Sequence, residues 1–460
     1  MIYRAKHVLP ITSGPINDGE VLIRGDRIEA VGVGLSRSHP EEPVHDLGDA
    51  ILMPGLVNSH AHLDYTMLRG AIDDLPLFPW VRRLTEYARA MTAEDYRWSS
   101  LLGAAECIQA GITTVADATP SGASLDALLE SGLRGIVYQE VFGHGGDDPS
   151  PAIDALKSRL DLLVPRANGR VRVGISPHTV YTASAELLTA VRSVARQAAM
   201  PVCIHVAEST SEYEFCVRGT GEIAEFYEAL GEEWPCPGVS PVQYLYDLGV
   251  LGETTLAAHC VHVGEDDIRI LAVTRTGVAH CPRSNAKIGV GIAPVADMLK
   301  VGVRLGLGTD SAVSNNSLDI CGEMRSAALL QRISGANHGW TQMDTDSGFQ
   351  LSALSSQLSP VGAEAIVEAA TIGGARALGM ESSIGSLEPG KKADLAAIDL
   401  SRAGLFPNRD PYSTLVYCAS GRDAILTVVN GEAVYERGEL KTLDLAAIKR
   451  NVAERVERVG

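Results

Sequence analysis

The sequence lacks an excess of basic residues and any long apolar run. Its 39 lysines and arginines stand against 57 acidic residues, and the formal net charge is -18. A chain of this charge is a poor match for the phosphate backbone of a nucleic acid. No apolar stretch reaches the roughly 18 residues that a membrane span needs. We therefore expect neither a nucleic acid nor a membrane as a partner.

The sequence also lacks a dense cysteine framework. Its eight cysteines are scattered and form no CxxC pair, unlike those of small disulfide-stapled secreted domains. Cys107, Cys203, Cys260 and Cys281 lie in apolar stretches and are predicted to be reduced core residues. The opening MIYRAKHVLPITSG is too short and too polar for a secretory signal. These features predict a cytoplasmic protein.

The two ends of the chain differ from its middle. The 460 residues are enough for one large catalytic domain and a smaller one. The segment EVLIRGDRIEAVG alternates and turns at Gly25, and AILTVVNGEAVYERGEL carries an Asn430-Gly431 hairpin signal. We expect residues 1–52 and 371–460 to form one small β-sandwich domain, with a helix at the C-terminus.

In the middle, apolar runs alternate with helical stretches. The eight runs are ILMPGLVNSH, TTVAD, GIVYQEV, VRVGISPH, VCIHVAE, TTLAAHC, GVAHCPRS and RLGLGTD. Continuous apolar runs are typical of buried parallel strands, and eight of them predict an α/β fold, a (β/α)₈ TIM-type barrel over residues 53–370. Nearly every run ends in a polar residue, and the active site of such a barrel lies at the carboxyl ends of its strands.

A pair of histidines closes the first run. His60 and His62 are two residues apart, so in a strand they share one face. His205 ends the fifth run and Asp310 the eighth, which brings all four to one rim of the barrel. Three imidazoles and a carboxylate suit one divalent ion, Zn²⁺ before Fe²⁺ or Mn²⁺. The fourth run contains no lysine that could bridge a second metal when carboxylated.

Two more polar residues suit catalysis at this rim. Glu208 lies three residues after His205, where a carboxylate can carry a proton from the water to the substrate. His259 ends the sixth run and can polarise the water or the tetrahedral centre. Asp310 can also accept the proton of the water. Each residue has a plainer alternative: Glu208 as a solvated loop residue, and Asp310 as a helix cap.

Several segments carry a family resemblance. They are PGLVNSHAH, HVAES, AAHCVH, CPRSN, GVRLGLGTDSAVSNNSLD and GSLEPGKKADLAAIDL. Together they resemble the amidohydrolase superfamily, in the branch that deaminates nucleobases and related heterocycles. The resemblance implies that His60, His62, His205 and Asp310 bind the metal, that Glu208 shuttles a proton, and that His259 is the catalytic histidine.

Within that branch two groups are most similar. AAHCVH and the SNNSLD segment resemble S-adenosylhomocysteine/5'-methylthioadenosine deaminases, whereas IVYQEVFG and HVAESTSEYEFC resemble 6-aminodeoxyfutalosine deaminases. The first group often has an arginine near the end of strand three, where this chain has Gln139. Either resemblance implies removal of the 6-amino group from an adenine-ring nucleoside, with release of ammonia.

The substrate contacts are less specific in sequence. His178 ends the fourth run and either touches the substrate or lies behind the site. Arg69 either contacts the substrate or braces its loop, and Trp80 either stacks on a base or belongs to the core. Glu140 is expected at the pocket wall.

Other functions stay open at this point. Similar barrels hydrolyse other aromatic heterocycles, such as triazines, guanine and pterins. A non-catalytic scaffold is a further alternative, although such a scaffold usually loses ligands and the set here is intact. We expect a small heterocyclic substrate and a homo-oligomer, either a dimer or a tetramer.

Overall fold

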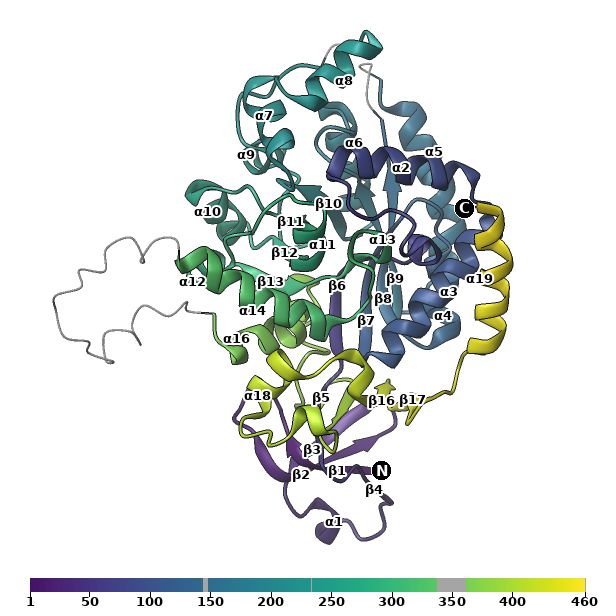
Figure 1. Cartoon of the computed structure of the whole chain (residues 1–460), viewed down its shortest axis with the longest axis vertical. Coiled ribbons are helices and arrows are strands. Elements are labelled where there is room, and N and C mark those ends of the chain that lie inside the picture. Colours follow the sequence, from purple (N-terminus) through teal and green to yellow (C-terminus); the bar gives the residue numbers. More distant parts are fainter. Residues whose placement is uncertain (144–147, 233, 337–360, 460) are drawn as a thin grey trace, which may run out of the picture.

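The computed structural model describes residues 1–143, 148–232, 234–336 and 361–459. Strands and helices alternate through the middle of the chain, and strands from both ends lie together below them in Figure 1. Within these ranges, no helix has both the length and the apolar character that crossing a bilayer requires.

The central sheet is parallel and has nine strands in the order β13-β12-β11-β10-β9-β8-β7-β6-β14. Nearly every residue in them is buried, which explains why they read as continuous apolar runs. Their bounds are β6 Leu56–His62, β7 Ile112–Thr119, β8 Arg134–Val141, β9 Val171–Pro177, β10 Val202–Val206, β11 Thr255–His259, β12 Gly277–His280, β13 Arg304–Leu307 and β14 Asp310–Ser311.

The sheet curls back on itself through its last run. β13 pairs with β12, and β14, only three residues further along the chain, pairs with β6 through Asp310 and Ala61. Gly308, between them, donates its backbone N–H to the carbonyl of His280 at 2.9 Å. The eighth predicted strand is therefore two short strands, and the fold is that of a TIM-type barrel.

Helices cover the outside of this sheet and follow its strands in sequence. The longer ones are α3 Ala93–Gln109, α4 Ser124–Ser131, α5 Ser150–Leu163, α6 Ala185–Gln197, α7 Thr210–Arg218, α8 Glu222–Leu230, α10 Glu265–Val273 and α14 Ile320–Ala336. The C-terminal helix α19, Leu445–Val459, runs beside α3 in Figure 1, and its Arg458 pairs with Asp95 of α3. Helix α2, Leu77–Ala90, lies at the end of the barrel away from the terminal strands.

Both chain ends contribute to a second sheet of nine strands. Its order is β18-β17-β16-β15-β5-β1-β2-β3, with β4 paired to β1. The bounds are β1 Ile2–Val8, β2 Ile16–Arg24, β3 Arg27–Gly32, β4 Val44–Asp46, β5 Ala50–Pro54, β15 Leu395–Asp399, β16 Ala424–Val429, β17 Glu432–Glu436 and β18 Glu439–Leu440. The shared sheet is thus present; its description as a β-sandwich and the boundaries at 52 and 370 stay predictions.

One predicted strand was wrong in its extent. The run ILMPGLVNSH is two strands, because β5 ends at Pro54 in the terminal sheet and β6 begins at Leu56 in the barrel. Gly55 separates them, and a Cβ there would stand 2.1 Å from the side chain of Thr113. An unbroken apolar run carries no mark of such a sheet change.

The two sheets are joined by a buried ion pair. Arg134 at the start of β8 binds Asp394, just before β15, with Nε to Oδ2 at 2.6 Å. Both side chains are buried, and the backbone N–H of Asn430 also donates to Asp394 at 2.8 Å. Breaking one partner of such a pair leaves an uncompensated buried charge, so the contact holds the terminal sheet against the bottom of the barrel.

Candidate active site

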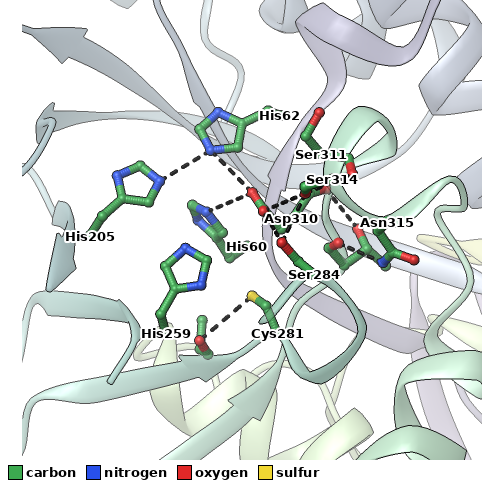
Figure 2. A network of polar contacts seen from close by, with 12 residues as sticks. His60, His62, His205, His259, Cys281, Ser284, Asp310, Ser311, Ser314 and Asn315 are labelled. Carbon is green, nitrogen blue, oxygen red and sulfur yellow. Dashed lines mark hydrogen bonds and ion pairs between the residues drawn. The ribbon is translucent and has the colours of Figure 1, made fainter. Parts of the chain in front are cut away.

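Four predicted ligands meet at the carboxyl ends of the barrel strands. His60 and His62 lie on β6, His205 on β10 and Asp310 on β14, and all are buried. His62 Nε2 is 3.1 Å from His205 Nε2, and Asp310 Oδ1 is 3.5 Å from the Nε2 atoms of both His60 and His62. Figure 2 shows the imidazole rings facing a common centre with Asp310 at one side.

The histidine rings are neutral and oriented. Burial lowers the pKa of His62 to about 3 and takes the pKa of His205 well below its ordinary value. His205 Nδ1 donates to the carbonyl of His178 at 2.9 Å, which leaves Nε2 as the ligand atom. His60 Nε2 is buried without a hydrogen-bond partner in the described chain. Neutral imidazoles with free, converging nitrogens fit a divalent ion.

Asp310 is held by two serines. Ser284 and Ser314 donate their hydroxyls to Oδ2 at 2.5 and 2.6 Å, so Oδ1 is the oxygen that faces the histidines. Burial acts to raise the pKa of Asp310, but the neighbouring imidazoles of His60, His62 and His259 hold it well below its ordinary value. The carboxylate is therefore ionised and aimed at the centre.

Glu208 and His259 lie at the edge of this cluster. His259 Nε2 is 3.6 Å from Glu208 Oε1, and its Nδ1 is 2.9 Å from Asn285 Oδ1. Burial, with a smaller contribution from Asp310, raises the pKa of Glu208 to about 8. A carboxyl group with a pKa near neutrality can both accept and donate a proton.

The backbone at two of these positions is strained. His259 has a φ of 72° and Asp310 a φ of 57°, in the left-handed region that side-chain-bearing residues seldom adopt. Such strain persists only where the surrounding structure imposes it, and it is frequent at functional sites. His259 ends β11 and Asp310 begins β14, and both side chains line the cavity.

A cavity of about 610 Å³ opens above the cluster. The strand ends form its floor, and helix α2 forms part of its wall. His178, directly after β9, and Glu140 of β8 line it, as predicted for pocket residues, and Trp80 lines it from α2. Trp80 Nε1 and Glu140 Oε1 are buried without hydrogen-bond partners in the described chain, so both are free to meet a ligand.

Two residues considered from sequence lie elsewhere. Arg69 is not among the lining residues of the cavity; its guanidinium pairs with Glu106 of α3. Glu106 also accepts the backbone N–H of Leu318 at 3.0 Å, so the geometry favours the bracing alternative for Arg69. Gln139 points away from the cavity and donates to the carbonyls of Thr119 and Pro120. Strand alternation turns its neighbour Glu140 inward instead.

Sequence reasoning assigned no role to the residues that support the ligands, although Ser284 ends the seventh run. Ser284 and Asn285 lie in CPRSN after β12, and Ser314 follows β14. The Ser284-Asn285 pair at the end of that run was the available signal. Glu140, His178 and His205 also bring ligand atoms within 4.8 Å of one another, as do His60, His62 and His205. The two groups share His205, so they describe overlapping parts of one site.

The sequence matches the amidohydrolase family over residues 51–434. The chain belongs to this family. Family membership makes the protein a hydrolase. Cys107, Cys203, Cys260 and Cys281 are buried and free, in line with their predicted reduced state.

Relatives of assigned function cover nearly the whole chain. A 5-methylthioadenosine/S-adenosylhomocysteine deaminase from Moorella thermoacetica is 36% identical over 98% of this chain and 97% of its own length. A protein of the same name from Symbiobacterium thermophilum is 38% identical over 93% of this chain and 92% of its own.

Solved structures agree in fold. An adenosine deaminase from Xanthomonas campestris with bound zinc has a TM-score of 0.83 and 28% identity, covering 100% of this chain and 98% of that one. An atrazine chlorohydrolase from Arthrobacter aurescens complexed with zinc has a TM-score of 0.81 over 99% of both chains, but at 23% identity it supports the fold alone.

Proposed function

We propose that this protein is a metal-dependent aminohydrolase that replaces the 6-amino group of an adenine-ring nucleoside by oxygen and releases ammonia. The observation that carries the proposal is the placement of Glu208. Its carboxyl group lies beside His259 at the edge of the His/Asp cluster, with a pKa raised to about 8. Expelling an amine requires protonation, and a carboxyl group so placed can supply the proton.

The metal would be held by His60, His62, His205 and Asp310. Three imidazoles and a carboxylate match the donor set of zinc, and zinc is bound in the Xanthomonas structure. We propose one Zn²⁺, with Fe²⁺ or Mn²⁺ as alternatives. When bound, such an ion lowers the pKa of a coordinated water toward 7 and supplies a nucleophile at neutral pH.

The chain's own residues then have distinct tasks. Glu208 accepts one proton of the attacking water and passes it to a ring nitrogen, and Asp310 accepts the second proton and returns it to the departing amine. His259 presents Nε2 as an acceptor toward the site and holds the attacking water by accepting its O–H. Collapse of the tetrahedral centre breaks the C–N bond, and the amine leaves as ammonia. His178, Glu140 and Trp80 contact the substrate from the cavity wall, whereas Arg69 braces its loop against α3.

Among adenine nucleosides, 5'-methylthioadenosine and S-adenosylhomocysteine are favoured over 6-aminodeoxyfutalosine. The support is the name shared by relatives that are 36 and 38% identical over nearly the full chain. Hydrolysis of another heterocycle, such as a triazine, guanine or a pterin, is the alternative. The intact ligand set with an adjoining Glu208 speaks against a non-catalytic scaffold. A cytoplasmic homo-oligomer, dimer or tetramer, completes the proposal; light scattering on the purified protein tests the assembly.

The test is a deamination assay on zinc-loaded protein, read as the shift from adenine to hypoxanthine absorbance. The panel contains 5'-methylthioadenosine, S-adenosylhomocysteine, 6-aminodeoxyfutalosine and adenosine. We expect turnover of the thioether nucleosides and a loss of about 10³-fold in Glu208→Gln with metal content kept. An active Glu208→Gln variant would refute the role of Glu208. No turnover of any adenine nucleoside would refute the proposed function and direct the search to guanine, pterins and triazines.

A further inference from the structure

Part of the cavity wall is apolar. Phe78, Val81 and Leu84 line it from α2, next to Thr85 and Arg89 of the same helix, and Phe142, Tyr181 and Ile288 also line the cavity. Phe142 is 46% exposed and Val81 36% exposed, so apolar surface continues to the mouth. Large apolar side chains left partly open to solvent around a cavity are typical of a surface that a ligand covers.

The ionisable side chains that line the cavity are mostly acidic or imidazole groups. Glu140, Glu208 and Asp310 are among the lining residues. Arg89, near the end of α2, is the single lysine or arginine among the described residues that line it, and its side chain is exposed. The ranges outside the described residues contain no lysine or arginine in sequence. An exposed guanidinium contributes little to holding an anion, because water screens it.

The orientation of a bound nucleoside follows from the chemistry. The carbon that bears the amine must reach the cluster on the floor. The ribose is attached to the opposite side of the purine, and its 5' substituent is the part of the molecule farthest from that carbon. The 5' substituent therefore meets the apolar wall and the mouth.

We propose, resting on the function above, that the cavity selects adenine nucleosides whose 5' substituent is apolar and uncharged. A methylthio group packs on the wall of Phe78, Leu84 and Phe142, and burial of its apolar surface lowers the free energy of binding. An amino-acid tail brings both an ammonium and a carboxylate to the same wall, where no buried cation of the described chain receives the carboxylate. Placing an unpaired charge against an apolar surface costs free energy.

The test compares kcat/KM for 5'-methylthioadenosine and S-adenosylhomocysteine on the zinc-loaded full chain. We expect the methylthio substrate to be preferred by about tenfold or more, equivalent to about 1.4 kcal/mol. Equal values, or a preference for S-adenosylhomocysteine, would overturn the inference while leaving the deaminase function standing. No hypoxanthine from either substrate would overturn the proposed function itself.

Two variants of α2 sharpen this test. Leu84→Arg adds a cation on the wall at a partly buried position, and it should lower the preference about fivefold by pairing with the tail carboxylate. Ala90→Arg adds the same charge on the same helix at an exposed position outside the lining, and it should leave the ratio unchanged. An equal effect of both variants on the kcat/KM ratio would show that long-range electrostatic attraction changes the preference, and not pairing at the cavity wall.

Arg89→Leu is the decisive third variant. If the wall alone sets the preference, Arg89→Leu keeps it at about tenfold or more. A selective loss of kcat/KM for S-adenosylhomocysteine would show that Arg89 receives the tail, and the inference would then fail.

Discussion

Asn285 Oδ1 lies 2.9 Å from His259 Nδ1, and both side chains are buried. An amide oxygen can only accept, so His259 carries its proton on Nδ1. Its Nε2, 3.6 Å from Glu208 Oε1, then presents a lone pair toward the site. Asn285 is a positioning residue that sets which form of the ring faces the reaction.

Removing this acceptor should slow the reaction without removing the metal. We expect Asn285→Leu to lower kcat about 10- to 100-fold, because His259 loses its fixed tautomer. Asn285→Asp keeps an accepting oxygen at the same place and should retain much more activity. The measurement is kcat alongside metal content for both variants. Equal losses in the two would show that Asn285 serves packing only.

Gly308 leaves room for the metal ligand His60. A Cβ at Gly308 would stand 2.9 Å from the Cβ, N and O atoms of His60. Gly308→Ala should therefore shift β6 against the end of β13. The variant should then bind less zinc than the parent protein when both are given the same amount of zinc. Gly14→Ala is the control, because a Cβ at Gly14 meets nothing within 4 Å. Full zinc occupancy in Gly308→Ala would contradict the close contact between Gly308 and His60.

Metal content should separate ligands from other histidines. His205→Ala removes a ligand at the centre of the cluster, and we expect zinc to fall from about one equivalent to near zero after dialysis, with activity lost. His262→Ala is the matched control, because His262 bonds to the carbonyl of Val290 at 2.7 Å. Elemental analysis of both proteins gives the answer. Loss of zinc from the His262→Ala variant would mean that the proposed set of metal ligands is wrong.

The raised pKa of Glu208 has a consequence for stability in the metal-free protein. Its pKa rises from 4.5 to about 8 on folding, so the folded state keeps a proton that the unfolded state releases. Stability is thus unaffected by this group below about pH 4.5 and is lost progressively as the pH rises toward 8. Glu208→Gln removes this loss of folding stability at higher pH, because glutamine does not titrate.

We therefore expect metal-free Glu208→Gln to gain stability over the parent protein between about pH 5.5 and about pH 8.5, on the order of 2 to 3 kcal/mol. Thermal unfolding of both proteins across this range measures it. Exposed Glu222→Gln should show no such trend. A difference that does not change with pH would mean that Glu208 is ionised throughout.

Much of the barrel was predictable because its signals are local. Buried parallel strands read as apolar runs, and a polar residue at the end of each run marks the rim. Those two rules place His60, His62, His205 and Asp310 at one end of the fold before any coordinate is known. The same rules misjudge ILMPGLVNSH, because a strand that changes sheets at Gly55 stays apolar on both sides.

The sequence by itself determined the kind of barrel and the donor set at its rim, since both follow from residue type and a period of two along a strand. Only the tertiary structure decided which atoms face the centre, that Asn285 orients His259, that Arg69 turns to Glu106, and that α2 supplies an apolar wall. These depend on contacts between segments distant in sequence, for which local periodicity carries no information.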